Sequence, residues 1–99
     1  HTSASLCIQE NASEDVIEDI LYFFKKLVPE NASLYRHNLE GSDDMPAHIK
    51  SMLTQTSLAI PVSNKKMHLG TWQGIFLIEH RSSSMQRKIN LTLLGESEK

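Results

Sequence analysis

The feature that most limits how this chain can fold is an amphipathic helix spanning residues 13–28. Its apolar residues recur every three or four positions, a spacing that places them along one side of an α-helix. Ser13 suits the N-cap position, and Pro29 ends the helix because proline cannot continue it. An apolar stripe this wide must pack on a sheet or another helix, so we expect a layered α/β domain. The stripe consists of Val16, Ile17, Ile20, Leu21, Phe23, Phe24, Leu27 and Val28.

The segments on either side of this helix have the pattern of β-strands. Residues 2–8 read as a strand entered halfway along its length, so we expect an N-terminal part of the domain to precede them. Asn64, in the turn between two later strands, suits a left-handed backbone. Turn residues bound these later strands, as is typical of strand boundaries. They are expected at residues 57–62, 67–80 and 87–95.

A polar loop and a short second helix occupy the middle of the chain. Residues 30–45 carry many acids together with tyrosine, arginine and histidine. A loop of this length inside a compact domain is usually functional or disordered, and its chemistry favours the functional interpretation. Pro46 suits the first turn of the helix that follows. We expect Ile49, Met52 and Leu53 to face inward from it.

The composition is that of one ordinary globular domain over residues 1–99, with 39% hydrophobic and 22% charged residues. The net charge of −2 leaves no basic field for nucleic acid. No apolar run in the sequence, residues 75–78 included, is long enough to span a membrane. Cys7 is the single cysteine, so an internal disulfide is excluded and a cytoplasmic, reducing location is expected.

Four strings of the sequence resemble one family when they are taken together and in order. They cover residues 1–6 (HTSASL), 40–50 (EGSDDMPAHIK), 70–75 (GTWQGI) and 79–81 (EHR). This combination is similar to the YjbQ-like family, an uncharacterised protein family with the provisional label "secondary thiamine-phosphate synthase". The resemblance runs over nearly all 99 residues.

The resemblance implies a fold, an assembly and a class of reaction. The implied fold is a mixed α/β (α+β) β-sandwich of two sheets with two helices, which trimerises through orthogonally packed sheets. Two further strands usually precede the first string, so we expect a single domain that lacks its N-terminal strands. Lys65 and Lys66 stand where the family usually has glycine, and His68 has no family counterpart, so it is left out of the site.

Asp44 and His48 stand one helical turn apart near the start of the short helix. A neutral imidazole can bind a metal or polarise a substrate, and Asp44 is close enough in sequence to orient it. Both are therefore candidate catalytic residues. The alternative is that Asp43 and Asp44 only cap the helix and that His48 lies on the surface.

His80 ends the long strand on its apolar face, with Glu79 and Arg81 on the other. It is the third candidate catalytic residue, as a group that moves a proton. With His37 and His48 it would instead complete a three-imidazole site for a divalent metal, Zn²⁺ or Mg²⁺. The alternative is an ordinary hydrogen-bonded histidine of the core.

Arg81 is the strongest candidate for binding an anion, because a guanidinium can hold a phosphate or carboxylate through two bonds. Without a glycine-rich phosphate loop, a nucleotide P-loop is excluded. The alternative is that the hydroxyls of Thr2, Ser3 and Ser5 only form hydrogen bonds at strand edges and that Arg81 pairs with Glu79 or Glu96. The other candidate anion- or substrate-binding residues are Thr2, Ser3, Ser5, Lys50 and Gln73.

Three functions are consistent with these residues. The first is a thiamine-phosphate-synthase-type transferase, which would couple two phosphorylated small molecules and release pyrophosphate. The second is a homotrimer that binds a metal or anion without turnover. The third is an interaction module, in which the site serves only structure. Trp72 suits core or subunit-interface packing better than stacking on a substrate.

Overall fold

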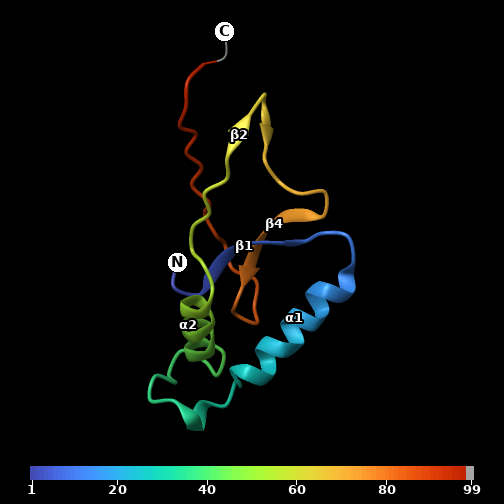
Figure 1. Ribbon diagram of the computed structural model, residues 1–99. Helices are drawn as coiled ribbons and strands as arrows, with labels where there is room; N and C mark the ends of the chain where they lie inside the picture. The colour runs from blue at the N-terminus through green and yellow to red at the C-terminus, as the bar shows by residue number, and fades with distance from the viewer. Residues whose placement is uncertain (98–99) are drawn as a thin grey trace.

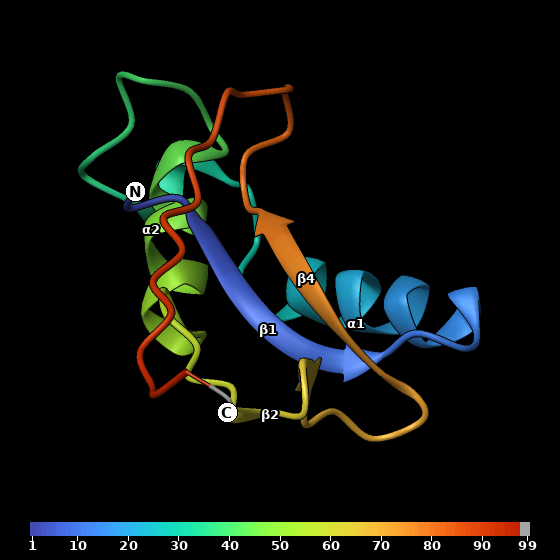
Figure 2. The ribbon, with the colours of Figure 1, turned by 90° about the horizontal axis from the view of Figure 1, so that it is seen from above.

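The computed structural model describes residues 1–97 and is a mixed α+β fold with two helices and two small antiparallel sheets. Helix α1 lies on one side of the main strand pair and helix α2 on the other, near the start of its first strand (Figures 1 and 2). The elements, in chain order, are β1 (Ala4–Glu10), α1 (Glu14–Leu27), the 3₁₀ turn η1 (Ala32–Leu34), α2 (Asp44–Leu53), β2 (Val62–Ser63), β3 (Lys66–Met67) and β4 (Gln73–Glu79).

Helix α1 confirms the helix expected from the apolar spacing. The Ser13 side chain accepts a hydrogen bond from the backbone N–H of Asp15, which satisfies one of the free donors at the helix start. At the other end the N–H of Val28 donates to the carbonyl of Phe24, and the helix stops before Pro29. Acidic residues occupy the first turn and lysines the last, an order that the helix dipole favours.

Strands β1 and β4 form the main sheet, and they pair antiparallel from Ala4 opposite Glu79 to Glu10 opposite Gln73. This pairing joins residues about 70 positions apart in the chain and brings the HTSASL string beside the EHR string. The smaller sheet is the β2–β3 hairpin, where Asn64 and Lys65 adopt positive φ angles of 50° and 63°. The left-handed turn expected at Asn64 is therefore confirmed.

Three expected strands differ from what the structure contains. Of residues 57–62 only Val62 belongs to a strand, as the first residue of β2, and residues 87–95 form none. Alternating residues favour an extended backbone, but a strand also needs a partner to accept its hydrogen bonds. The long strand over 67–80 is divided by a turn in which Gln73 Oε1 accepts from the N–H of Gly70, at 2.6 Å.

Helix α2 forms where it was expected, with Pro46 in its first turn, but its orientation was predicted wrongly. Met52 is 89% exposed and Leu53 58% exposed, whereas Ala47 and Lys50 are buried. Asp44 and Lys50 share the buried side of α2 with Pro46 and Ala47. The polar residues of this side therefore lie in the interior, and Met52 and Leu53 lie on the surface.

The arrangement of these elements is open. The radius of gyration is 16.5 Å, against about 13 Å for a compact chain of this length. Among the residues described, the buried hydrophobic side chains of the core are Ala4, Val28 and Ala47, and no residue of α1 is buried. Within residues 1–97 neither α1 nor α2 has the length and apolarity needed to cross a bilayer.

Candidate functional site

The candidate site is built around Asp44, at the start of α2. This side chain is 4% exposed, and its Oδ2 atom lies 2.7 Å from His37 Nε2. His48 Nε2 lies 3.4 Å from the same oxygen, one helical turn along. A hydrogen bond therefore folds the loop back onto the helix, and one buried carboxylate orients two imidazoles.

These three side chains form a compact group of metal-ligating atoms. One ligand atom from each lies within 4.8 Å of those from the other two. The imidazole rings of His37 and His48 meet edge to face, with their centroids 5.5 Å apart. Two imidazoles and one carboxylate are a donor set that transition metals such as Zn²⁺ accept. Both histidines retain surface exposure, so the group is open to solvent on one side.

Arg81 joins this group to the end of β4. Its Nη1 donates to Asp44 Oδ1 at 2.9 Å and its Nε to Asp43 Oδ2 at 3.1 Å, while Nη2 donates to the carbonyl of Glu40 at 3.0 Å. The hydrogen bond from Arg81, followed by one from the backbone N–H of Ser82, lowers the pKa of Asp43. The expected anion clamp is thus occupied by the protein's own carboxylates, and Arg81 acts on the site by holding Asp44.

The loop before α2 depends on Gly41 for this arrangement. Gly41 has a φ angle of 114°, which side-chain-bearing residues rarely adopt. A Cβ atom at this position would lie 2.9 Å from Asp43 Oδ1 and 3.7 Å from Arg81 Nη2. The glycine therefore permits both the turn and the close approach of the guanidinium.

His80 lies apart from the group around Asp44, in the interior. It is 5% exposed, and its Nε2 lies 2.8 Å from the hydroxyl of Ser5 on β1. Its ring also meets the Phe24 ring of α1 edge-on, with centroids 6.5 Å apart. Burial, and next the charge of nearby Lys50, lower the pKa of His80. The structure therefore gathers His37 and His48 around Asp44 and places the third expected metal ligand in a separate polar cluster.

We expect the buried His80 to make the fold sensitive to mild acid. Because folding lowers its pKa below the ordinary 6.5, the unfolded chain binds the proton first as pH falls. Stability is therefore complete above pH 6.5 and is lost as pH falls toward the lowered pKa. Glutamine at position 80 cannot titrate. Thermal unfolding at pH 8 and pH 5 should show a smaller drop in midpoint for His80→Gln than for the parent chain, and equal drops would contradict the prediction.

The remaining expected anion-binding residues are dispersed over the fold. Ser3 is 1% exposed and Ser5 2% exposed, and both are hydrogen-bonded within the protein. Lys50 is buried on α2, and Gln73 holds the turn before β4. Thr2 is exposed at the start of the chain. In this structure no single anion pocket contains all of these residues together with Arg81.

Two residues that take part in these clusters were missed in the sequence. Arg87 is 6% exposed on its side chain and forms an ion pair with Glu79, the partner that we had considered for Arg81. Its Nη2 also donates to Ser3 Oγ at 2.9 Å. Thr54, at the end of α2, is hydrogen-bonded to Ser5, and its hydroxyl lies 3.4 Å from His80 Nε2. Only its position as a helix C-cap could have drawn attention to Thr54, and nothing in the sequence distinguished Arg87 from Lys88.

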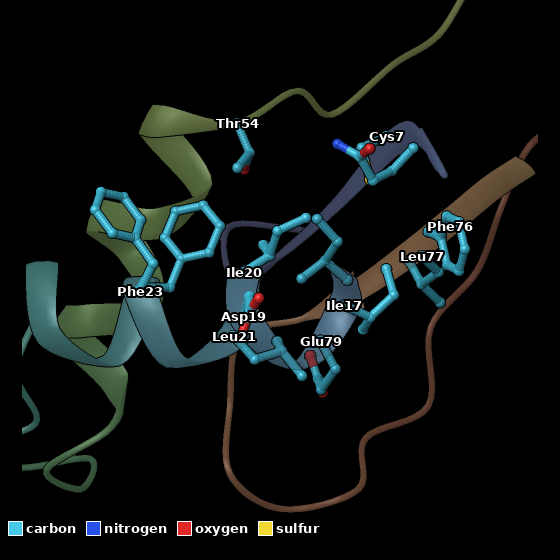
Figure 3. Close-up of a pocket in the computed structure, with 13 residues that line it drawn as sticks. Cys7, Ile17, Asp19, Ile20, Leu21, Phe23, Thr54, Phe76, Leu77 and Glu79 are labelled. Carbon is cyan, nitrogen blue, oxygen red and sulfur yellow. The ribbon is translucent and has the colours of Figure 1, made fainter. Parts of the chain in front are cut away.

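A separate cavity of about 670 Å³ lies between α1 and the face of the main sheet. Figure 3 shows Ile17 and Ile20 of α1 on one side of it and Phe76 and Leu77 of β4 on another. Its lining is mostly apolar and includes none of His37, Asp44 and His48. The cavity therefore reflects the uncovered apolar side of α1 and is not part of the candidate site.

Comparison with known proteins identifies relatives over almost the whole chain. A family model described as "UPF0047 protein YjbQ-like" matches residues 1–96. The UPF0047 protein sll1880 of Synechocystis sp. is 57% identical over 96 residues, which are 97% of this chain and 65% of that protein. The YjbQ protein of Salmonella typhimurium is 52% identical over 97% of this chain and 69% of its own length. The chain thus spans about two thirds of the curated relatives that it matches.

Solved structures support the same assignment. An uncharacterized YjbQ/UPF0047 protein of Clostridium acetobutylicum is 43% identical, with a TM-score of 0.74 over 83% of this chain and 60% of that one. The conserved hypothetical protein TT1486 of Thermus thermophilus is 36% identical and also has a TM-score of 0.74, over 83% of this chain and 63% of that one. The family model covers residues 1–96, and both the sequence and the fold match those of family members. The chain therefore belongs to the YjbQ-like UPF0047 family.

Proposed function

We propose that His37, Asp44 and His48 bind a divalent metal and that this metal centre serves an enzyme acting on phosphorylated small molecules. The observation that carries the proposal is the approach of three ligand atoms to within 4.8 Å of one another around a buried carboxylate. Three protein ligands with solvent on one side are typical of catalytic metal sites, in which a further position stays open.

The residues fit Zn²⁺ better than Mg²⁺. Imidazole nitrogens suit Zn²⁺ and other transition metals, whereas Mg²⁺ prefers oxygen ligands and water. Arg81 supports the fit because it donates to Asp44 Oδ1 and leaves Oδ2 facing the two histidines. Hydrogen bonds to a ligating carboxylate commonly fix its orientation. His80 stands outside this set, and we assign it to proton transfer and not to ligation.

The reaction that we propose is the one implied by the family resemblance. A pyrimidine diphosphate would be coupled to a thiazole phosphate with loss of pyrophosphate, and a bound divalent cation would stabilise the leaving pyrophosphate. Within the chain, Arg81 keeps Asp44 in place, and the ammonium of Lys50 adds positive charge beside His80. Burial lowers the pKa of His80, which favours the neutral ring that can accept a proton.

A second candidate is metal binding without turnover. It is favoured by one observation: the donors of Arg81 already reach Asp43, Asp44 and the Glu40 carbonyl. A guanidinium that is satisfied in this way has less capacity to recognise a substrate phosphate. In this case the same three ligands would hold a regulatory or stored metal in a homotrimer.

One experiment separates the two candidates. Metal content is measured after dialysis against Zn²⁺, and thiamine phosphate formation is then assayed from the two phosphorylated precursors, with Zn²⁺ or Mg²⁺ and with chelator. The His48→Ala variant is compared with His68→Ala, which removes an exposed histidine away from the site. Metal-dependent product that is lost only in His48→Ala supports the enzyme. Metal retention without product supports the binding function, and absence of bound metal contradicts both.

We also propose that the chain works as a homotrimer, as the family resemblance implies. The support is the number of large apolar side chains left on the surface, including Trp72 at 65% exposure and Phe23 at 60%. Large apolar side chains that gather on a surface usually mark sites of association. Light scattering should give three times the chain mass, and the mass of a single chain at all concentrations would contradict the trimer.

A further inference from the structure

A continuous chain of hydrogen bonds connects His80 to the end of α2. His80 Nε2 lies 2.8 Å from Ser5 Oγ, and Ser5 Oγ is hydrogen-bonded in turn to Thr54 Oγ1. Thr54 Oγ1 donates to the backbone carbonyl of Lys50 at 2.7 Å. These groups come from β1, the end of β4 and the last turn of α2, so three elements meet in one polar cluster.

The direction of each hydrogen bond follows from the number of hydrogens available. A carbonyl oxygen only accepts, and a hydroxyl has a single hydrogen to donate. Since Thr54 gives its hydrogen to the Lys50 carbonyl, the Ser5 hydroxyl must donate to Thr54. The hydrogen between Ser5 and His80 must therefore belong to the ring nitrogen. The second contact, 3.4 Å from His80 Nε2 to Thr54 Oγ1, requires a donor on the same nitrogen.

We propose that Ser5 and Thr54 are positioning residues that hold His80 in the tautomer with hydrogen on Nε2. Nδ1 is then the nitrogen with a free lone pair, and it is the only ring atom that can accept a proton or ligate a metal. The catalytic use of Nδ1 rests on the proposed function, whereas the tautomer itself depends only on the hydrogen-bond chain. In a proton transfer, a substrate O–H or N–H bond breaks, a bond forms to Nδ1, and the ring becomes an imidazolium.

This order of hydrogens also assigns Ser5 a role. A serine nucleophile must donate its hydrogen to the histidine that activates it, but here the Ser5 hydrogen is directed to Thr54. Ser5 therefore acts on the ring and does not attack a substrate. The charges that face the ring are those of Lys50 and Arg87, which oppose the imidazolium, and that of Glu79, which favours it. Together with burial, these charges disfavour the imidazolium relative to the neutral ring.

The tautomer is read directly by ¹⁵N–¹H correlation spectra of the histidine rings, recorded at about pH 8, where histidines are neutral. In the parent chain His80 should show a protonated Nε2 and an unprotonated Nδ1. Thr54→Val removes the hydroxyl that accepts from Ser5 and keeps the shape of the side chain. Ser5 then becomes free to donate its hydrogen to the His80 ring. The tautomer with hydrogen on Nδ1 should then reach a population comparable with that of the tautomer with hydrogen on Nε2.

Two further variants complete the test. Thr54→Ser restores the hydroxyl and should restore the parent spectrum. Ser5→Ala removes the acceptor of the Nε2 hydrogen and should also give mixed tautomers. The ring signals of His37, His48 and His68 serve as internal references. A parent chain with hydrogen on Nδ1, or a Thr54→Val spectrum identical to the parent's, would overturn the proposal. Neither metal nor substrate is present, so a failure of the proposed function would leave this result unaffected.

Discussion

The Asp44→Asn variant is expected to bind Zn²⁺ about 100-fold more weakly than the parent chain. This is the upper end of the loss in metal affinity seen when a residue that supports a metal ligand is mutated, and Asp44 is itself a proposed ligand. Asp44 contributes the one buried carboxylate of the group, and both histidines point at its Oδ2 atom. An amide at this position keeps the shape but loses the negative charge that attracts the cation. Competition with a chromophoric chelator measures the difference.

Glu18→Gln is the matched control for this prediction. It removes the same charge from an exposed position on α1 and should leave the affinity unchanged. His37→Ala provides a second test, because the His37 side chain is 52% exposed and its loss does not disturb the interior. A drop in affinity is expected there too. If neither Asp44→Asn nor His37→Ala weakens binding, the metal lies elsewhere.

The Arg87→Met variant is expected to lower the free energy of unfolding by about 3 kcal/mol, at the low end for breaking a buried ion pair. The Arg87 side chain is 6% exposed and its partner Glu79 28% exposed. Without the guanidinium, the Glu79 carboxylate keeps its charge in a partly buried position, and Ser3 loses a donor. Equilibrium urea unfolding measures the loss.

Two variants show whether the charge pair is responsible. Lys88→Met removes the neighbouring charge from an exposed side chain and should change the stability little. The double variant Glu79→Gln/Arg87→Met removes both charges and should recover part of the loss, because no uncompensated charge remains. A double variant as unstable as the sum of the single ones would indicate that Arg87 contributes by packing alone.

The parts of the fold that could be predicted are those set by neighbouring residues. Helix α1 follows from its apolar spacing, its Ser13 cap and Pro29, all within one short stretch. The turn at Asn64 is equally local. The expected strand over 87–95 depended on a partner that the local pattern does not contain, and these residues have none in the described part of the chain. Strand pairing is set by distant segments, so alternation alone overestimates it.

The candidate site divides in the same way. The approach of Asp44 to His48 follows from a spacing of four residues on a helix, and it could be predicted. The hydrogen bonds from Arg81 to Asp43 and Asp44 join residues 37 and 38 positions apart, and no local rule identifies them. Lys50 was expected to bind an anion, but the face of α2 that packs on β1 carries it into the interior.

His80 and Arg81 are adjacent in the chain, yet they serve different clusters: one reaches Ser5 on β1, and the other reaches the loop before α2. The register of β4 therefore determines the direction of both the His80 and the Arg81 side chains. Deleting one residue within β4 would turn every later side chain to the opposite face, so the imidazole and the guanidinium would exchange places and both clusters would be lost together. A deletion in the turn before β4 would leave the ladder intact. In a lineage that accumulates insertions and deletions, the two clusters are therefore inherited as one unit.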